Sequence, residues 1–394
     1  MLFALRGLQK LMGLIALYFI VRAISPEMYG QYQFILSVIA LLSITTFPGF
    51  SDAATQSIAR GHLGTYRLTN RYSFFGSLTG SLMCLIVASW YLWNENDLYM
   101  AVGFLMAATL FPFAKGLMQW NTLKTGQERF SSLVKWEGAS AIAMQLAIIV
   151  GVLLVPNTFL IPLLCILVVP ALQNLLLTWQ AHKEIQKNST IEEGSISYGI
   201  KTSIYTIPVI FSMHIEKFLL FTFLSPASLA LFVAAEKIPE MVRSLIQDIG
   251  GVLAPNFARR KKYTKKLDNF FRYFSLVGAI LIALFAFTVL PLIFTTLFGS
   301  EYKEAIPYTI AIMCSIAVGN TAMLRARYIR SQQDVRSIRN IRLIMAFTRI
   351  TVALILVPIY GLAGAVTSVF IMRFVVSIFV NAIIEERYKT PKES

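Results

Sequence analysis

The sequence predicts an all-α polytopic membrane protein, with twelve transmembrane helices in two six-helix parallel repeats around a central cavity. Three observations carry this: the composition, twelve long apolar runs and an internal repeat. The 394 residues are 56% hydrophobic and only 14% charged, whereas soluble domains carry about 25% charged residues. This composition excludes a water-soluble enzyme, and three cysteines are too few for a disulfide framework.

Twelve apolar runs predict the transmembrane helices, because a spanning helix needs about 20 mostly apolar residues. The twelve runs are 8–24, 34–50, 72–92, 99–113, 139–155, 159–177, 200–224, 229–253, 274–297, 306–324, 343–360 and 362–383. The first run lacks a small-residue cleavage site, so we expect a retained helix and not a signal peptide. The fourth run is the shortest, because Pro112 and Lys115 limit it.

The basic residues predict the orientation. Lys10, Arg22 and Lys201 stand near the ends of their runs and are counted with the adjoining loops. With the N-terminus inside, 28 of the 35 Lys and Arg then fall on the cytoplasmic side, two (Arg22 and Lys303) fall outside and five lie deeper within the runs. Cytoplasmic loops carry such an excess of positive charge, so we expect both termini in the cytoplasm. The net charge of +15 then reflects membrane anchoring and contacts with anionic lipids, and predicts no nucleic-acid partner.

An internal repeat indicates a duplication. ISPEMY at 24–29 matches LSPASL at 224–229, and RLTN at 67–70 matches KLDN at 266–269. A unit of six helices returns the chain to its starting side, so the copies are parallel repeats. We therefore expect an N-terminal bundle at 1–185, a cytoplasmic linker at 186–199 and a C-terminal bundle at 200–394.

Ionisable residues within the runs predict a polar lumen. Each costs about 2.5–3.5 kcal/mol at a helix centre unless it faces protein or water. The alternative is a paired network that only docks helices. The cations that we expect to bind substrate are Arg243, Arg373, Lys217, Arg349, Lys237 and Arg22. The carboxylates and the histidine that we expect in the lumen, as candidates for ion coupling, are Glu216, Glu236, Glu240, Asp248 and His214.

Motifs for catalysis, cofactors and metals are missing from the sequence. The segment GSISYGIK at 194–201 resembles a phosphate-binding loop, but Ile200 stands where that motif needs Lys. His214 has no second His or Cys at ligand spacing. We therefore expect no enzyme activity, no cofactor and no metal site.

Five segments, spread over nearly the whole chain, have the pattern of a known family. The segments are ISPEMYGQY at 24–32, GFSDAATQSIAR at 49–60, IEKFLL at 215–220, LFGSEYKEAIP at 297–307 and LVPIYGLAGAV at 356–366. They resemble the O-antigen and polysaccharide flippases of the multidrug, oligosaccharidyl-lipid and polysaccharide exporter superfamily. In this family, late in the seventh helix, an Asp is often followed by an Arg; this chain has Glu216 and Lys217 there, which preserves both charges.

The resemblance implies a flippase that moves an undecaprenyl-diphosphate-linked oligosaccharide across the bacterial cytoplasmic (inner) membrane by alternating access, in O-antigen, lipopolysaccharide or other surface polysaccharide biosynthesis. The implied partners are the lipid-linked oligosaccharide and membrane lipids. Coupling to H⁺ or Na⁺, and contacts with the polysaccharide polymerase and chain-length proteins, are further candidates.

Four alternatives remain open. A peptidoglycan-precursor flippase of the same superfamily usually has fourteen helices, whereas this chain has twelve runs. An ion-coupled drug antiporter of the same superfamily shares the architecture, although five cations within the runs suit an anionic head group better. A major-facilitator sugar transporter needs a basic Gly-x-x-x-Asp loop after the second helix, and the expected loop at 51–67 lacks it. A scaffold without transport activity needs no charged eighth helix.

Overall fold

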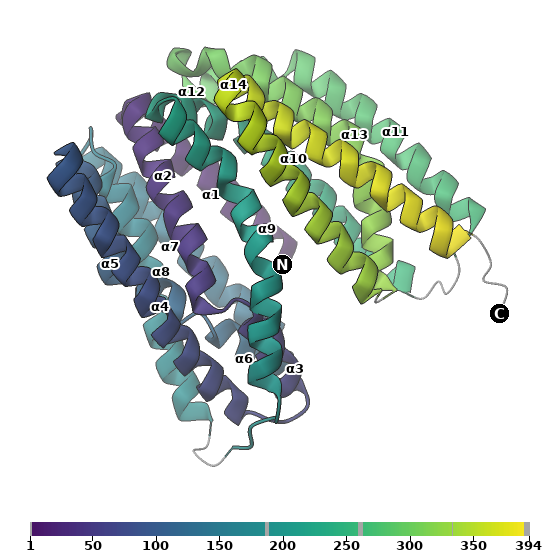
Figure 1. Cartoon of the computed structure of the whole chain (residues 1–394), viewed down its shortest axis with the longest axis horizontal. Helices are drawn as coiled ribbons and strands as arrows, with labels where there is room; N and C mark the ends of the chain where they lie inside the picture. The colour runs from purple at the N-terminus through teal and green to yellow at the C-terminus, as the bar shows by residue number, and fades with distance from the viewer. Residues whose placement is uncertain (1, 186–188, 259–262, 333, 390–394) are drawn as a thin grey trace. The chain divides into compact units, whose positions relative to one another are not determined.

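The structure, a computed structural model, describes residues 2–185, 189–258, 263–332 and 334–389. This described part is helical and contains no strand (Figure 1). The helices are α1 (Leu2–Ala23), α2 (Pro26–Leu42), α3 (Gly49–Ala59), α4 (Gly64–Trp90), α5 (Leu98–Phe111), α6 (Trp120–Gly126), α7 (Phe130–Leu154), α8 (Leu160–Glu184), α9 (Ser195–Phe223), α10 (Pro226–Ala258), α11 (Lys265–Thr288), α12 (Leu290–Phe298), α13 (Ile306–Ser331) and α14 (Val335–Ile384).

Nine helical stretches in the described residues are long and apolar enough to cross a membrane. One of them contains α14, which holds the last two expected runs as two arms that meet at Gly361. The helices α1 and α10 hold two further runs, and α10 concentrates Glu236, Lys237, Glu240 and Arg243 within eight residues. The chain is thus an all-α, multi-pass membrane protein, and the expected runs fall in its helices.

The first of two compact units comprises Met1–Ile210. In it α4 packs on α5, and α7 packs on both α1 and α8. The segment that we expected as a loop at 51–67 contains most of α3 and the start of α4, so this expectation was wrong in part. Helix α3 forms because Ala54 and Ile58 lie on one face, which packs against Tyr66 and Leu123.

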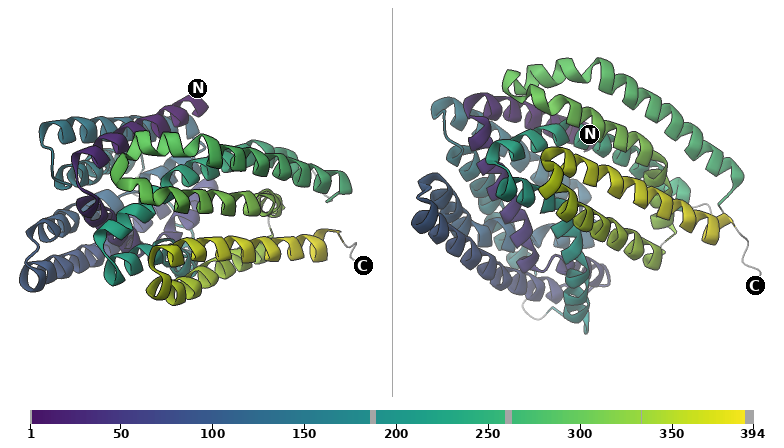
Figure 2. Two further views of the ribbon diagram at one scale, coloured as in Figure 1. Left: turned by 90° about the horizontal axis from the view of Figure 1, so that it is seen from above. Right: turned by 45° about the horizontal axis from the view of Figure 1, so that its top comes forward.

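The second unit comprises Phe211–Ser394. Its central helix is α13, which packs on α10, α11 and α14. The two arms of α14, yellow-green and yellow, run side by side in Figure 2. They reverse at Gly361, whose φ of 58° is unfavourable for any residue with a side chain. This hairpin brings Arg349 of the first arm and Arg373 of the second into one unit with α10.

The repeated SP sequence forms the same local structure in each unit. Ser25 accepts a hydrogen bond from the backbone N–H of Met28 at the start of α2, and Ser225 accepts one from Ser228 at the start of α10. In both cases proline follows as the first helical residue, where its missing N–H costs nothing. The duplicated motif is therefore a helix cap.

The division between the units lies within α9. Helix α8 ends at Glu184 and α9 begins at Ser195, so the helical structure enters the expected linker at 186–199. The expected bundle boundaries, and the cavity expected between the bundles, stay predictions.

Candidate functional site

A cavity of about 160 Å³ within the second unit collects charged side chains from α9, α10 and α14. We call it the mixed cavity, because both signs of charge line it. Ile312 of α13, Met345 and Met372 contribute apolar walls. Its charged or ionisable lining residues are His214, Lys217, Glu236, Glu240, Arg243, Arg349 and Arg373.

The helical repeat explains why three of these residues come from one helix. Glu236, Glu240 and Arg243 stand four and three residues apart, and residues at this spacing lie on one face. Glu236 is buried, whereas Glu240 is exposed. The stripe thus runs from a buried position to an accessible one along the wall of the mixed cavity.

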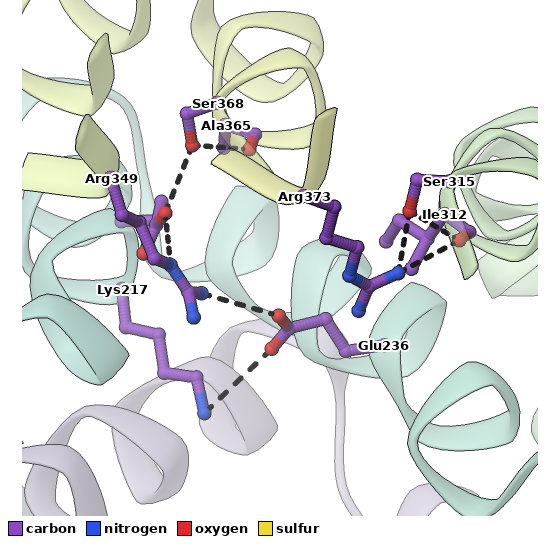
Figure 3. Close-up of polar contacts among 9 residues, drawn as sticks. Lys217, Glu236, Ile312, Ser315, Arg349, Ala365, Ser368 and Arg373 are labelled. Carbon is purple, nitrogen blue, oxygen red and sulfur yellow. Dashed lines mark hydrogen bonds and ion pairs between the residues drawn. The ribbon is translucent and has the colours of Figure 1, made fainter. Parts of the chain in front are cut away.

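Two cations of the site are neutralised by a buried network between helices (Figure 3). The Nε of Arg349 lies 2.6 Å from Oε1 of Glu216, and its Nη2 lies 3.6 Å from Oε1 of Glu236. The Nζ of Lys217 lies 3.9 Å from Oε2 of Glu236. Because these pairs join α9, α10 and α14, the network also holds the three helices together.

Glu216 is the most buried member of this network. Its side chain has 0% exposure, and its Oε1 also accepts a hydrogen bond of 2.9 Å from the Ser368 hydroxyl. Its other oxygen, Oε2, is buried and has no hydrogen-bond partner among the described residues. Glu216 therefore depends on Arg349 and Ser368 for its stabilisation.

Arg373 and Arg243 differ from the paired cations. The Nη1 of Arg373 donates to the carbonyl oxygen of Ile312, at 3.1 Å, and to the hydroxyl of Ser315 (Figure 3). Both acceptors are neutral, and neither arginine forms an ion pair with any carboxylate in the described ranges. These two guanidinium groups keep their charge available to a ligand in the cavity.

The structure does not bring every predicted residue into the site. Lys237 is not among the described residues that line the mixed cavity. Arg22 is exposed in the first unit, where its guanidinium lies 4.7 Å from the centre of the Tyr18 ring. The side chain of Asp248 lies outside the described residues.

Sequence reasoning missed Ser315 and Ser368, since isolated serines within apolar runs give no signal. It also did not anticipate that the pairs would join different helices. The alternative that we weighed, a paired network that docks helices, has its counterpart in contacts from Glu236 to Lys217 of α9 and to Arg349 of α14. The described residues hold no group of three or more His, Cys, Asp or Glu side chains that could bind a metal ion.

Comparison with known proteins identifies the family. A family model described as "Polysaccharide biosynthesis protein" matches residues 1–261, which is well over half of the chain. Comparison with curated proteins gives no significant match.

Solved structures show the fold. The lipid II flippase MurJ in an inward closed conformation matches with a TM-score of 0.70 and 12% identity, over 98% of this chain and 87% of that chain. An inward-facing multidrug resistance transporter of the MATE family and MOP superfamily matches with a TM-score of 0.67 and 13% identity, over 96% of both chains.

A third structure is a MOP superfamily transporter from Pyrococcus furiosus, described as having a binding pocket of reversed polarity. It matches with a TM-score of 0.65 and 13% identity, over 100% of this chain and 94% of that chain. The chain thus belongs to the polysaccharide biosynthesis protein family and has the fold of the MOP superfamily transporters.

Proposed function

We propose that this protein is a flippase that moves an undecaprenyl-diphosphate-linked oligosaccharide from the inner to the outer leaflet of the bacterial cytoplasmic membrane. The product serves O-antigen or other surface polysaccharide biosynthesis. The family, which covers polysaccharide biosynthesis, and a fold shared with a lipid II flippase support this proposal.

The observation that carries the proposal is the charge of the mixed cavity. Four cations line it against two carboxylates, Glu236 and Glu240. Lys217 and Arg349 are paired, whereas Arg243 and Arg373 form no ion pair among the described residues. A polyprenyl tail can stay in lipid, so the diphosphate and the sugars are the groups that need a polar path. The planar fork of Arg fits phosphate oxygens through two parallel hydrogen bonds.

An ion-coupled drug antiporter is the second candidate, because a MATE multidrug transporter shares the fold. A cationic drug needs an accessible carboxylate, and Glu240 is exposed on the wall of the mixed cavity. The excess of cations in the cavity favours the anionic substrate. The two candidates make opposite predictions for Glu240 and Arg373, which the experiment below uses.

The energy source is part of the proposal. Coupling to H⁺ or Na⁺ needs a carboxylate or histidine that changes its occupancy during transport. Glu240 is exposed and lines the cavity, and two buried atoms, Oε2 of Glu216 and Nδ1 of His214, have no hydrogen-bond partner in the part of the chain that the structure describes. These three groups are our candidates for coupling. Functional contacts with a polymerase and with chain-length proteins would follow from the same role.

The experiment reconstitutes the protein in liposomes that contain the lipid-linked oligosaccharide. It measures the fraction of glycan that a membrane-impermeant glycosidase reaches after flipping from the opposite leaflet. We expect the double variant Arg243→Gln, Arg373→Gln to abolish flipping. The charge-matched control is Arg336→Gln, Arg339→Gln, at two exposed positions outside the cavity, and it should retain activity.

The outcomes separate the candidates. Absence of flipping by the unsubstituted protein would overturn the proposal, and flipping at the control rate in the double variant would overturn the role of the two arginines. Drug efflux that is lost in Glu240→Gln, by a protein that does not flip glycan, would instead identify an antiporter.

A further inference from the structure

A second cavity of about 220 Å³ adjoins the mixed cavity within the second unit. Arg243, Met345, Met372 and Arg373 line both cavities. The other walls come from α10, α13 and α14. We call it the arginine cavity, because its charged lining residues are Arg243, Arg327, Arg330 and Arg373.

The arginine cavity has no acidic side chain among its described lining residues. Gln247 is its other strongly polar residue, and the Nη2 of Arg327 donates to the backbone oxygen of Gln247 at 3.4 Å. Arg330 is exposed and forms no ion pair in the described part of the chain. Four like charges repel one another around one small space, so a multivalent anion bound between them would stabilise all four.

The two cavities follow one another along the helices. On α13 the mixed cavity is lined at Ile312 and the arginine cavity from Ile316 to Arg330. The rise of 1.5 Å per residue puts Arg330 about 27 Å beyond Ile312 along that helix. Arg330 is one residue from the end of α13, on the side that the basic residues of the sequence predict as cytoplasmic. Arg243 and Arg373 stand where the cavities meet.

Arg327 and Arg330 differ from ordinary membrane anchors. The sequence places them in a basic stretch whose plainest interpretation is the positive-inside rule. Arg336 and Arg339 of the same stretch are exposed and line neither described cavity. Arg327 and Arg330 share a cavity wall with arginines from two other helices. A membrane anchor does not require arginines of several helices to line one cavity, whereas a binding site for an anion does.

We propose that the arginine cavity binds the diphosphate of the lipid-linked substrate first and passes it to the mixed cavity. This inference rests on the proposed function and names the path of the charged head group. Because Arg243 and Arg373 line both cavities, the diphosphate keeps two guanidinium partners throughout the transfer. Arg327 and Arg330 bind the diphosphate first, in the arginine cavity. The paired cations Lys217 and Arg349 line the mixed cavity, which receives the diphosphate afterwards.

The test measures binding of two probes to the purified full chain in neutral detergent. The probes are inorganic pyrophosphate and farnesyl diphosphate, which share the diphosphate and differ in the lipid chain. Because each guanidinium can donate charge-assisted hydrogen bonds to phosphate oxygens, we expect the variant Arg327→Gln, Arg330→Gln to weaken binding of at least one probe about tenfold or more. The charge-matched control Arg336→Gln, Arg339→Gln should change affinity less than about twofold.

The two probes distinguish the source of the recognised group. Equal affinities show that the diphosphate alone is recognised, and tighter binding of farnesyl diphosphate shows that the lipid chain contributes. Both results support the arginine cavity if they depend on Arg327 and Arg330. Equal weakening in the two double variants, or no weakening in either, overturns it. If the double variant fails to fold, Arg330→Gln at its exposed position carries the same test.

Failure of this inference is distinguishable from failure of the proposed function. Probe binding that depends on Arg327 and Arg330, in a protein that does not flip glycan, leaves the anion site standing and rejects the flippase. If the protein flips glycan but its probe binding does not depend on Arg327 and Arg330, the role of the arginine cavity is rejected and the proposed flippase function is retained.

Discussion

Arg349 and Glu216 form the shortest ion pair of the mixed-cavity network, with 2.6 Å between Nε and Oε1. The two residues lie 133 positions apart in the sequence, on α14 and α9. The Arg349 side chain is only 11% exposed and that of Glu216 is fully buried. Removing one partner of a buried ion pair strongly destabilises the fold, because the remaining charge then has no counterion.

The pair therefore predicts an asymmetric stability effect. Arg349→Ala leaves Glu216 buried and uncompensated, so we expect a loss of about 3–5 kcal/mol in the free energy of unfolding. Glu216→Gln keeps an acceptor for Ser368 and should cost less. Adding Glu216→Gln to Arg349→Ala should recover part of the loss. Unfolding of the purified protein in detergent, followed by helix content, measures all four proteins. Additive losses in the double variant would contradict the coupling.

The fold could be predicted from the sequence because its determinants are local and one-dimensional. Apolar length gives the helices, and the proline after Ser25 and Ser225 gives the same cap twice. The segment with α3 was missed because its buried face, with Ala54 and Ile58, is short and its composition is polar enough for a loop.

The site could be predicted only in part. Helical spacing along α10 correctly places Glu236, Glu240 and Arg243 on one face, and all three line the mixed cavity. Pairing between helices cannot be read from spacing, so the neutralisation of Arg349 by Glu216 was not foreseen. The same limit explains Arg327, which looks like an anchor until α10, α13 and α14 are packed together.

The α14 hairpin predicts a specific role for Gly361. A side chain at φ 58° and ψ −129° lies outside the left-handed helical region and is strained by about 1–3 kcal/mol, and its Cβ would lie 2.9 Å from Cδ2 of Leu224. We expect Gly361→Ala to lower the melting temperature and flipping together, because the hairpin positions Arg349 and Arg373. Gly13→Ala is the control, since among the described residues a Cβ there meets only Nε2 of Gln145, at 3.8 Å. An unchanged melting temperature in Gly361→Ala would contradict the strained turn.

The distribution of basic residues predicts the orientation in the membrane. A reporter that is active only outside the cell should give signal when fused in the loop at Asn96, and none when fused at Gly194. Cell-based activity, normalised to the amount of protein, measures this. The reverse pattern would reject a cytoplasmic position for both termini.

The face of α10 that carries Glu240 and Arg243 should be accessible to water-soluble reagents. Single cysteines at Glu240 and Arg243, in a protein without its three native cysteines, should react with a charged, membrane-impermeant thiol reagent. A cysteine at Leu245 should not, although Leu245 is 55% exposed, because we place this apolar position against lipid. Equal reactivity at all three positions, measured by mass shift in intact membranes, would mean that the exposed surface near Leu245 faces water.

The last prediction concerns the chemistry of Arg373. Its Nη1 is held by the Ile312 carbonyl and the Ser315 hydroxyl, so the rest of the guanidinium can present its donors to a ligand. Lysine keeps the charge but is a point donor without the planar fork. We therefore expect Arg373→Ala to abolish flipping, Arg373→Lys to restore it only partly, and Ser315→Ala to retain most of it because the charge remains. The rate of glycan exposure per protein in liposomes orders the three variants. Full activity in Arg373→Ala would show that this arginine does not receive the substrate, and full rescue by lysine would show that charge alone is sufficient.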